Sequence, residues 1–76
     1  MAQVTVFTKN NCVQCKMTKR YLDSMGVGYE EINIEEQPEY LAQLKDAGFK
    51  QTPVVQIAGQ EAFSGFQPDA LKSLTA

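Results

Sequence analysis

Short strand-like segments alternate along this chain with segments that repeat apolar side chains every three or four residues. The strand-like segments are residues 3–7, 29–34, 54–57 and 61–63, and the helix-like segments are residues 12–25, 38–47 and 68–74. Alternation over two residues is typical of a half-buried strand, and the longer period is typical of an amphipathic helix. The order β-α-β-α-β-β-α within 76 residues therefore predicts a small α/β fold.

Each predicted helix has signals at its ends. Asn11 is the expected N-cap of the first helix, because its side chain can accept from amides of the first turn. Pro38 and Pro68 suit first helical positions, and Gly26 and Gly48 suit helix ends. The side chains expected to face the core from these helices are Met17, Tyr21, Leu22, Met25, Tyr40, Leu41, Leu44, Ala47, Ala70, Leu71 and Leu74.

The connections predict how the strands pair. A helix separates the first two strands, which favours parallel pairing through a right-handed crossover. The turn at residues 58–60 joins the last two strands, which we expect to be antiparallel. The sequence thus predicts a single domain over residues 1–76, with a four-stranded mixed sheet covered by helices.

Composition excludes several classes of function. The longest apolar run is three residues, far short of the roughly 20 that span a membrane. A net charge of −2 and a pI near 4.9 provide no positive field for nucleic acid. The N-terminal residues resemble a strand rather than a secretion signal, so we expect a cytoplasmic protein. Disulfides in the cytosol are usually transient and catalytic, which bears directly on the two cysteines.

The strongest chemical signal is Cys12-Val13-Gln14-Cys15, placed between the first strand and the first helix. A cysteine reacts as its thiolate, and the positive end of a helix stabilises an anion. Cys12, expected at an exposed first turn, is therefore the predicted nucleophile, with Lys9 adding positive potential. Cys15 lies one turn further on and should point inward. It is the predicted resolving thiol, which attacks the mixed disulfide formed by Cys12.

Three other interpretations of the cysteine pair remain open. It could form a structural disulfide, although so short a loop constrains the unfolded chain by only about 2 kcal/mol. It could hold zinc or an iron–sulfur cluster, but the chain has no His and no further Cys, so a partner or external thiol would supply ligands. It could also be two unrelated buried thiols. The placement between strand and helix favours a redox-active pair.

Two further segments are candidate parts of a site. Thr52-Pro53 precedes the third strand, where the proline forces Thr52 into an extended conformation. Taken alone, it is an ordinary strand-start proline. The segment Ser64-Gly65-Phe66 either docks a loop on the core or forms a partner-contact surface. The acidic residues at 30–31 and 35–36 are interpreted as a solvated face.

The chain resembles the NrdH-redoxins. The resemblance rests on Cys-Val-Gln-Cys after residues 8–11, on Thr52-Pro53-Val54 and on the segment 64–69, and it covers nearly the whole length. It implies a glutaredoxin-type thioredoxin fold in which a cis-proline at Pro53 faces the cysteines. It further implies a monomer with no bound cofactor beyond a Cys12–Cys15 disulfide. The residues implied to contact partners are Val13, Gln14, Thr52, Pro53, Ser64, Gly65 and Phe66.

The same resemblance implies the partners. Members of the family donate hydrogen to class Ib ribonucleotide reductase and are reduced by NADPH-dependent thioredoxin reductase. The chain departs from the family pattern at two positions. Phe63 replaces the usual tryptophan, which removes an indole N–H. Gln67 replaces a basic residue, which removes a positive charge near a helix start.

Other classes compete with this assignment. A glutathione-using glutaredoxin has the same fold but commonly carries Cys-Pro-Tyr-Cys, and Gly-Gly followed closely by Asp before the last helix. This chain has Val13-Gln14 in the first motif and residues 64–67 in place of the second. An iron–sulfur module would hold a cluster through Cys12 across a dimer. A structural interaction domain with no redox chemistry is the remaining hypothesis.

Overall fold

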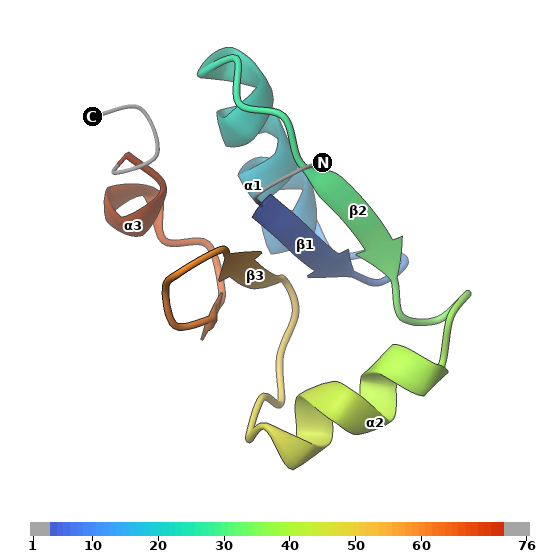
Figure 1. Cartoon of the computed structure of the whole chain (residues 1–76). Helices are drawn as coiled ribbons and strands as arrows, with labels where there is room; N and C mark the ends of the chain where they lie inside the picture. The colour runs from blue at the N-terminus through green and yellow to red at the C-terminus, as the bar shows by residue number, and fades with distance from the viewer. Residues whose placement is uncertain (1–3, 73–76) are drawn as a thin grey trace.

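The computed structural model describes residues 4–72, and the order of its elements is the one that the sequence predicts (Figure 1). The strands are β1 (Val4–Thr8), β2 (Glu30–Asn33), β3 (Val54–Ile57) and β4 (Phe63–Ser64). The helices are α1 (Val13–Ser24), α2 (Glu39–Asp46) and α3 (Pro68–Lys72). The predictions made for Gln3 and Leu74 lie outside the described residues.

The four strands form one mixed sheet in the order β2-β1-β3-β4. β1 pairs with β2 in parallel, with Val6 opposite Glu31, and with β3 antiparallel, with Val6 opposite Val55. β3 and β4 are antiparallel, with Val55 opposite Phe63. The predicted parallel and antiparallel pairings are therefore both confirmed. β4 begins two residues later than residue 61, because the turn that follows Ile57 is longer than predicted.

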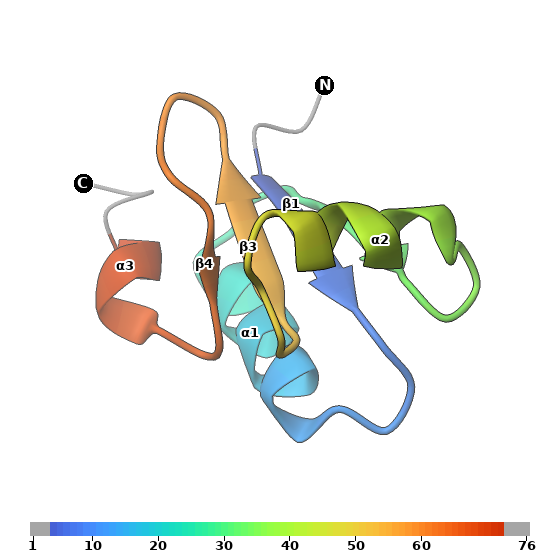
Figure 2. The ribbon, with the colours of Figure 1, turned by 90° about the horizontal axis from the view of Figure 1, so that it is seen from below.

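The sheet separates α2 from α1 and α3 (Figures 1 and 2). On the face of α1 and α3, Leu22 and Leu71 pack against Val4, Val6, Val55 and Ile57. On the face of α2, the buried cluster is Phe7, Ile32, Ile34, Leu44 and Val54. Alternate residues of β1 thus enter different clusters, as the pleat of a strand requires. The result is a three-layer fold, with the sheet between α2 and the pair α1 and α3. The cysteine motif follows the end of β1, in the middle layer.

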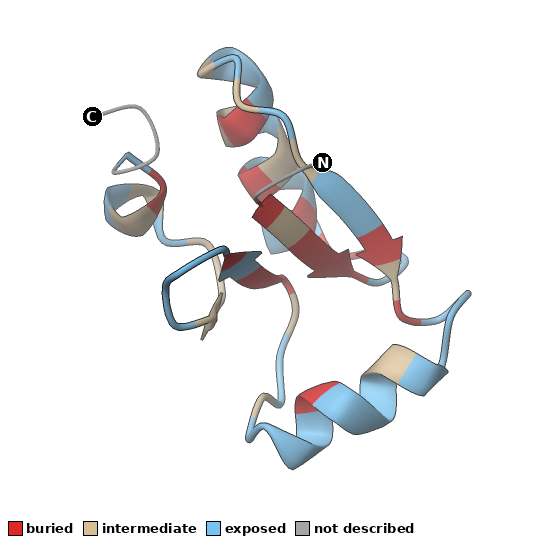
Figure 3. Cartoon of the chain, viewed as in Figure 1, coloured by how far each residue is buried: buried red, intermediate tan, exposed pale blue. Residues whose placement is uncertain are grey.

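The helices bury narrower stripes than the sequence predicts (Figure 3). In α1 the buried residues are Cys15, Thr18 and Leu22, which lie on one face at intervals of three and four. Met17 is 43% exposed, so its assignment to the core is wrong. In α2 only Leu44 is buried, while Leu41 and Ala47 are exposed. α2 covers its face of the sheet through one buried side chain, Leu44, which packs beside Phe7 and Val54 of the central strands, and through the partly buried Tyr40.

The helix ends follow the sequence with two corrections, at Pro38 and at Asn11. Gly26 and Gly48 adopt positive φ angles of 71° and 91° after α1 and α2, which confirms them as stop residues. Pro68 is the first residue of α3, whereas Pro38 precedes the first residue of α2. Asn11 is not the N-cap of α1. It has a φ of 58°, and Cys12 takes the capping position.

Candidate active site

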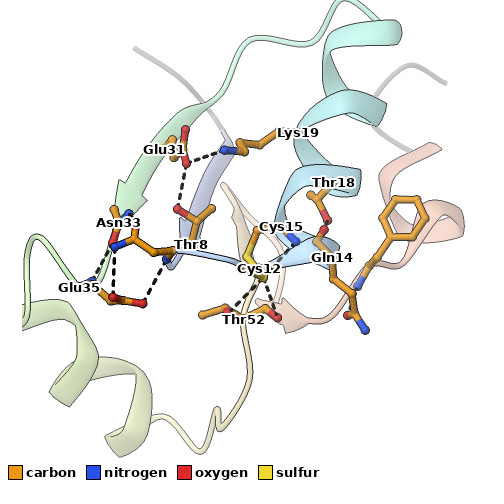
Figure 4. The surroundings of a disulfide bond; sticks show 12 residues. Thr8, Cys12, Gln14, Cys15, Thr18, Lys19, Glu31, Asn33, Glu35 and Thr52 are labelled. Atoms are coloured by element: carbon orange, nitrogen blue, oxygen red, sulfur yellow. Dashed lines mark hydrogen bonds and ion pairs between the residues drawn. A yellow bond between two sulfur atoms is a disulfide. The ribbon is translucent and has the colours of Figure 1, made fainter.

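The two cysteines of the motif are joined by a disulfide at the start of α1 (Figure 4). Their Cα atoms are 5.2 Å apart. Cys12 is 8% exposed and Cys15 is 2% exposed. The prediction of an exposed Cys12 is therefore wrong in degree, because Thr52 lies against its sulfur. Cys12 remains the more accessible of the two, and Cys15 points inward as predicted.

Cys12 caps α1 with its sulfur atom. The amide of Cys15 donates to Cys12 Sγ at 3.1 Å, and the amide of Lys16 donates to the Cys12 carbonyl at 3.2 Å. The first amides of a helix have no partner within the helix, so they are satisfied by such caps. When Cys12 is reduced, the same amide can donate to a thiolate, which is a stronger, charge-assisted interaction. The capping position therefore favours ionisation of Cys12.

Thr52 lies beside Cys12 on the loop that leads into β3, and the Thr52–Pro53 peptide bond is cis. Thr52 Oγ1 lies 3.5 Å from Cys12 Sγ and can donate to it. The Thr52 carbonyl oxygen lies 3.7 Å from the same sulfur. A disulfide sulfur has no hydrogen to donate, so the carbonyl contact becomes a hydrogen bond only in the thiol form. The Thr52 hydroxyl can thus donate to the Cys12 thiolate, and the Thr52 carbonyl can accept from the Cys12 thiol.

The segment Ser64–Phe66, which starts at the last residue of β4, is bonded to the Thr52–Pro53 loop and to the cysteine motif. The amide of Gly65 donates to the carbonyl of Pro53 at 2.8 Å, with Gly65 at a φ of 82°. The amide of Phe66 donates to Gln14 Oε1 at 3.2 Å. The Phe66 ring meets the Tyr21 ring edge-on, with centroids 6.0 Å apart. Residues from three distant parts of the sequence therefore surround the disulfide, and Ser64–Phe66 is both a docked loop and its border.

The loop before Cys12 is held by contacts that the sequence analysis missed. Glu35 accepts from the backbone amide of Asn10 at 3.1 Å and from the Asn10 side chain at 3.2 Å. Asn33 donates to Asn10 Oδ1 at 3.0 Å. The sequence predicts only a solvated face at Glu35, which lies 25 residues from its partner Asn10. The one local signal was Asn33, whose side chain accepts from the amide of Glu35.

A second group of polar contacts joins the end of β1 to α1. The Thr8 hydroxyl donates to Glu31 Oε2 at 2.9 Å, and Lys19 Nζ forms an ion pair with the same oxygen at 2.9 Å. The hydrogen bond from Lys19 is the main cause that lowers the pKa of Glu31 below its ordinary value, opposed by partial burial and assisted by Thr8. This network supports the strand from which the loop to Cys12 departs.

Lys9 lies at a cavity that is lined by Thr52 but by none of residues 64–66. This cavity of about 410 Å³ is also lined, on the α2 side, by apolar residues that include Leu44 and Phe49. Lys45 and Lys50 are the other charged residues that line it. The structure thus places Lys9 at the rim of a basic, partly apolar cavity. Its effect on Cys12 stays a prediction. Val13 is 70% exposed and projects from the same end of the molecule.

Within residues 4–72, no cluster of three or more His, Cys, Asp or Glu side chains could hold a metal ion. No helix in that part of the chain is long and apolar enough to cross a bilayer.

The fold and the bonded cysteine pair define a thiol–disulfide oxidoreductase with a thioredoxin fold. The sequence model of the glutaredoxin family matches residues 4–62. Glutaredoxin-like protein NrdH of Lactococcus lactis is 46% identical over 71 residues, which cover 93% of this chain and 97% of that protein. The Escherichia coli protein of the same name is 44% identical over 72 residues, covering 95% and 88%.

Solved structures agree with the sequence comparison. NrdH-redoxin from Escherichia coli superposes with a TM-score of 0.88 at 45% identity, covering 93% of this chain and 92% of that one. The thioredoxin-like protein BC3987 superposes with a TM-score of 0.79 at 32% identity, covering 93% and 97%. The chain therefore belongs to the glutaredoxin family and, within it, to the glutaredoxin-like NrdH proteins.

Proposed function

We propose that this protein is a cytoplasmic dithiol electron carrier that works as a monomer and donates hydrogen to class Ib ribonucleotide reductase. NADPH-dependent thioredoxin reductase is the proposed source of its electrons. The observation that carries the proposal is the Cys12–Cys15 disulfide at the start of α1, with Thr52 against the more accessible sulfur. The NrdH relatives support the choice of partners, and the solved Escherichia coli protein has a thioredoxin-like activity profile.

The proposed cycle moves two electrons and two protons. The Cys12 thiolate attacks one sulfur of the acceptor disulfide, and the other acceptor sulfur leaves as a thiolate. Cys15 then loses its proton and attacks Cys12 Sγ in the mixed disulfide. The Cys12–Cys15 bond forms and the second acceptor thiolate leaves. Both acceptor thiolates take up protons, so the acceptor ends as a dithiol and this protein ends in the disulfide form.

The surrounding residues have distinct tasks in this proposal. The Thr52 hydroxyl donates to Cys12 while it is a thiolate. The backbone at Thr52 and Pro53 holds the acceptor chain beside the sulfur. The exposed Val13 side chain contacts the partner, together with the rim formed by Ser64–Phe66. Because Cys15 is almost fully buried, it reacts only with the sulfur that is bonded to Cys12.

A coupled assay tests the electron source. The protein is offered NADPH with thioredoxin reductase, or NADPH with glutathione and glutathione reductase, while purified class Ib ribonucleotide reductase serves as acceptor. We expect NADPH consumption to be at least tenfold faster with thioredoxin reductase. The reverse ranking would assign the protein to the glutathione-using glutaredoxins. A brown product after anaerobic reconstitution with iron and sulfide would instead favour the iron–sulfur hypothesis.

A further inference from the structure

The Gln14 side chain crosses from the cysteine motif to the loop after β4. Its Oε1 atom accepts from the amide of Phe66 at 3.2 Å. A Cβ atom added to Gly65 would lie 3.5 Å from the same oxygen, so the carboxamide also packs against Gly65. The Thr18 hydroxyl donates to the Gln14 carbonyl at 2.9 Å and fixes the backbone from which the side chain extends.

This contact occupies a backbone donor at the border of the site. The neighbouring amide of Gly65 is bonded to the backbone of Pro53, so it is satisfied whatever side chain stands at position 14. The amide of Phe66 depends on the Gln14 side chain, which is itself exposed. Removal of that carboxamide would leave the Phe66 N–H facing solvent beside the disulfide. A free backbone N–H in that place is a donor for an anion.

We propose that Gln14 is a specificity-determining residue, which keeps the Phe66 N–H from the carboxylate of a small peptide thiol and so disfavours glutathione. The inference rests on the proposed function, in which a flavoprotein reductase and not glutathione supplies electrons. Glutathione carries two carboxylates close to its thiol. When that thiol attacks Cys12, a carboxylate needs donors near the disulfide to offset its loss of water. Gln14 already holds one of those donors.

The reaction affected is reduction of the protein disulfide by glutathione. A glutathione thiolate attacks Cys12 Sγ, and Cys15 leaves as a thiolate and takes up a proton. A second glutathione thiolate then attacks the glutathione sulfur of the mixed disulfide. Oxidised glutathione forms, and Cys12 leaves as a thiolate. Two glutathione molecules are oxidised and one protein disulfide is reduced. Gln14 acts on the first attack, because the carboxylate is then placed beside the loop.

The test compares two thiols on the oxidised full-length protein. Rates of disulfide reduction are measured with glutathione and with 2-mercaptoethanol, which has no carboxylate. The quantity compared between variants is the glutathione rate divided by the 2-mercaptoethanol rate. In Gln14→Ala we expect this ratio to rise about tenfold, the size of one charge-assisted hydrogen bond. A change in reduction potential or in general loop mobility would alter both rates together and leave the ratio unchanged. Amide exchange at Phe66, measured by NMR, is expected to accelerate severalfold.

Two matched variants complete the design. Gln14→Glu retains an acceptor for the Phe66 amide and adds a charge that repels carboxylates, so the ratio is expected to stay at or below the original value. Gln67→Ala removes a side-chain bond to the carbonyl of Ser64 in the same loop without freeing an amide, so the ratio is expected not to change. An unchanged ratio in Gln14→Ala, or an equal rise in Gln67→Ala, would overturn the inference.

The two proposals fail in different ways. If the unmodified protein is reduced faster by glutathione than by thioredoxin reductase, the proposed electron source is wrong. If the unmodified protein behaves as proposed but Gln14→Ala leaves the ratio of thiol rates unchanged, only the role of Gln14 is wrong.

Discussion

The two sides of the disulfide differ in whether the chain's own hydrogen bonds occupy them or leave a cavity. On one side, the Ser64–Phe66 segment is bonded to Pro53 and to Gln14, so its amides at Gly65 and Phe66 are already used. On the other side, Thr52 touches Cys12 Sγ and also lines a cavity of about 410 Å³ whose charged residues are lysines. One side is therefore closed by the chain itself, and the other offers space and positive charge.

This difference indicates a direction of approach. A substrate chain that reaches Cys12 from the cavity side meets the backbone of Thr52, apolar side chains of the α2 layer and three lysines. On the other side the amides of Gly65 and Phe66 are already bonded, so Ser64–Phe66 contacts a partner through its remaining groups and not through these two donors. The predictions below test this asymmetry, beginning with the residue whose loss has the largest effect.

The largest expected effect comes from the cysteines. Because Cys12 lies against Thr52 on the open side, we expect Cys12→Ser to abolish disulfide reduction. Cys15→Ser should instead stop after the first attack and accumulate a mixed disulfide through Cys12. Non-reducing gel electrophoresis and intact-mass measurement with an oxidised protein substrate check both outcomes. Trapping by Cys12→Ser rather than Cys15→Ser would reverse the roles and make the closed side the reactive one.

An intermediate effect is expected from the charge of the cavity. The double variant Lys9→Glu and Lys50→Glu should slow reduction of an acidic synthetic peptide disulfide about fivefold at low ionic strength, and the loss should fade near 1 M salt. A basic peptide disulfide should show the opposite change. Arg20→Glu, which makes one such charge change on α1, is the control for each single variant, Lys9→Glu and Lys50→Glu. An effect of Arg20→Glu equal to that of either single variant would show that net charge alone matters.

The smallest effect concerns the scaffold beneath both sides. The pKa of Glu31 is lowered, chiefly by its hydrogen bond to Lys19, so ionised Glu31 stabilises the folded protein above the ordinary carboxyl pKa of 4.5. That contribution is lost as pH falls through the lowered value. We expect Glu31→Gln to reduce stability by about 0.5 kcal/mol at pH 7, as for an exposed ion pair.

Thermal unfolding measures this change as a decrease in Tm of about 2–4 °C at pH 7 that shrinks progressively below pH 4.5. Rates of thiol exchange at pH 7 should be unchanged in Glu31→Gln, since the network lies beneath the sheet end and not against either sulfur. A stability difference that grows as the pH falls would contradict the assigned direction of the pKa shift.

Local sequence patterns predicted the fold well because most of its determinants are local. The order of elements, the stops at Gly26 and Gly48 and the parallel start of the sheet all follow from spacing within a few residues. The inward Cys15 also follows from its place on the face of Thr18 and Leu22. The cis-proline was implied by family resemblance rather than by spacing.

The features that the sequence did not predict depend on contacts between distant segments. Met17 is apolar, yet it lies on the face of α1 away from the sheet, and residue type alone does not reveal that. The burial of Cys12 depends on Thr52, 40 residues away. The hydrogen bonds from Asn10 to Glu35 form only when β1 and β2 lie side by side. Each of these three features depends on the assembled sheet, so the hydrophobic periodicity of the sequence does not predict it.

The N-cap of α1 is also the proposed reactive atom, so two properties of the protein cannot be adjusted separately. A stronger cap makes the sulfur more acidic and readier to attack. The same interaction favours the reduced form of the pair, which raises its reduction potential and leaves less driving force for giving electrons away. The first turn of this helix therefore sets a compromise between how quickly the carrier reacts and how strong a reductant it is.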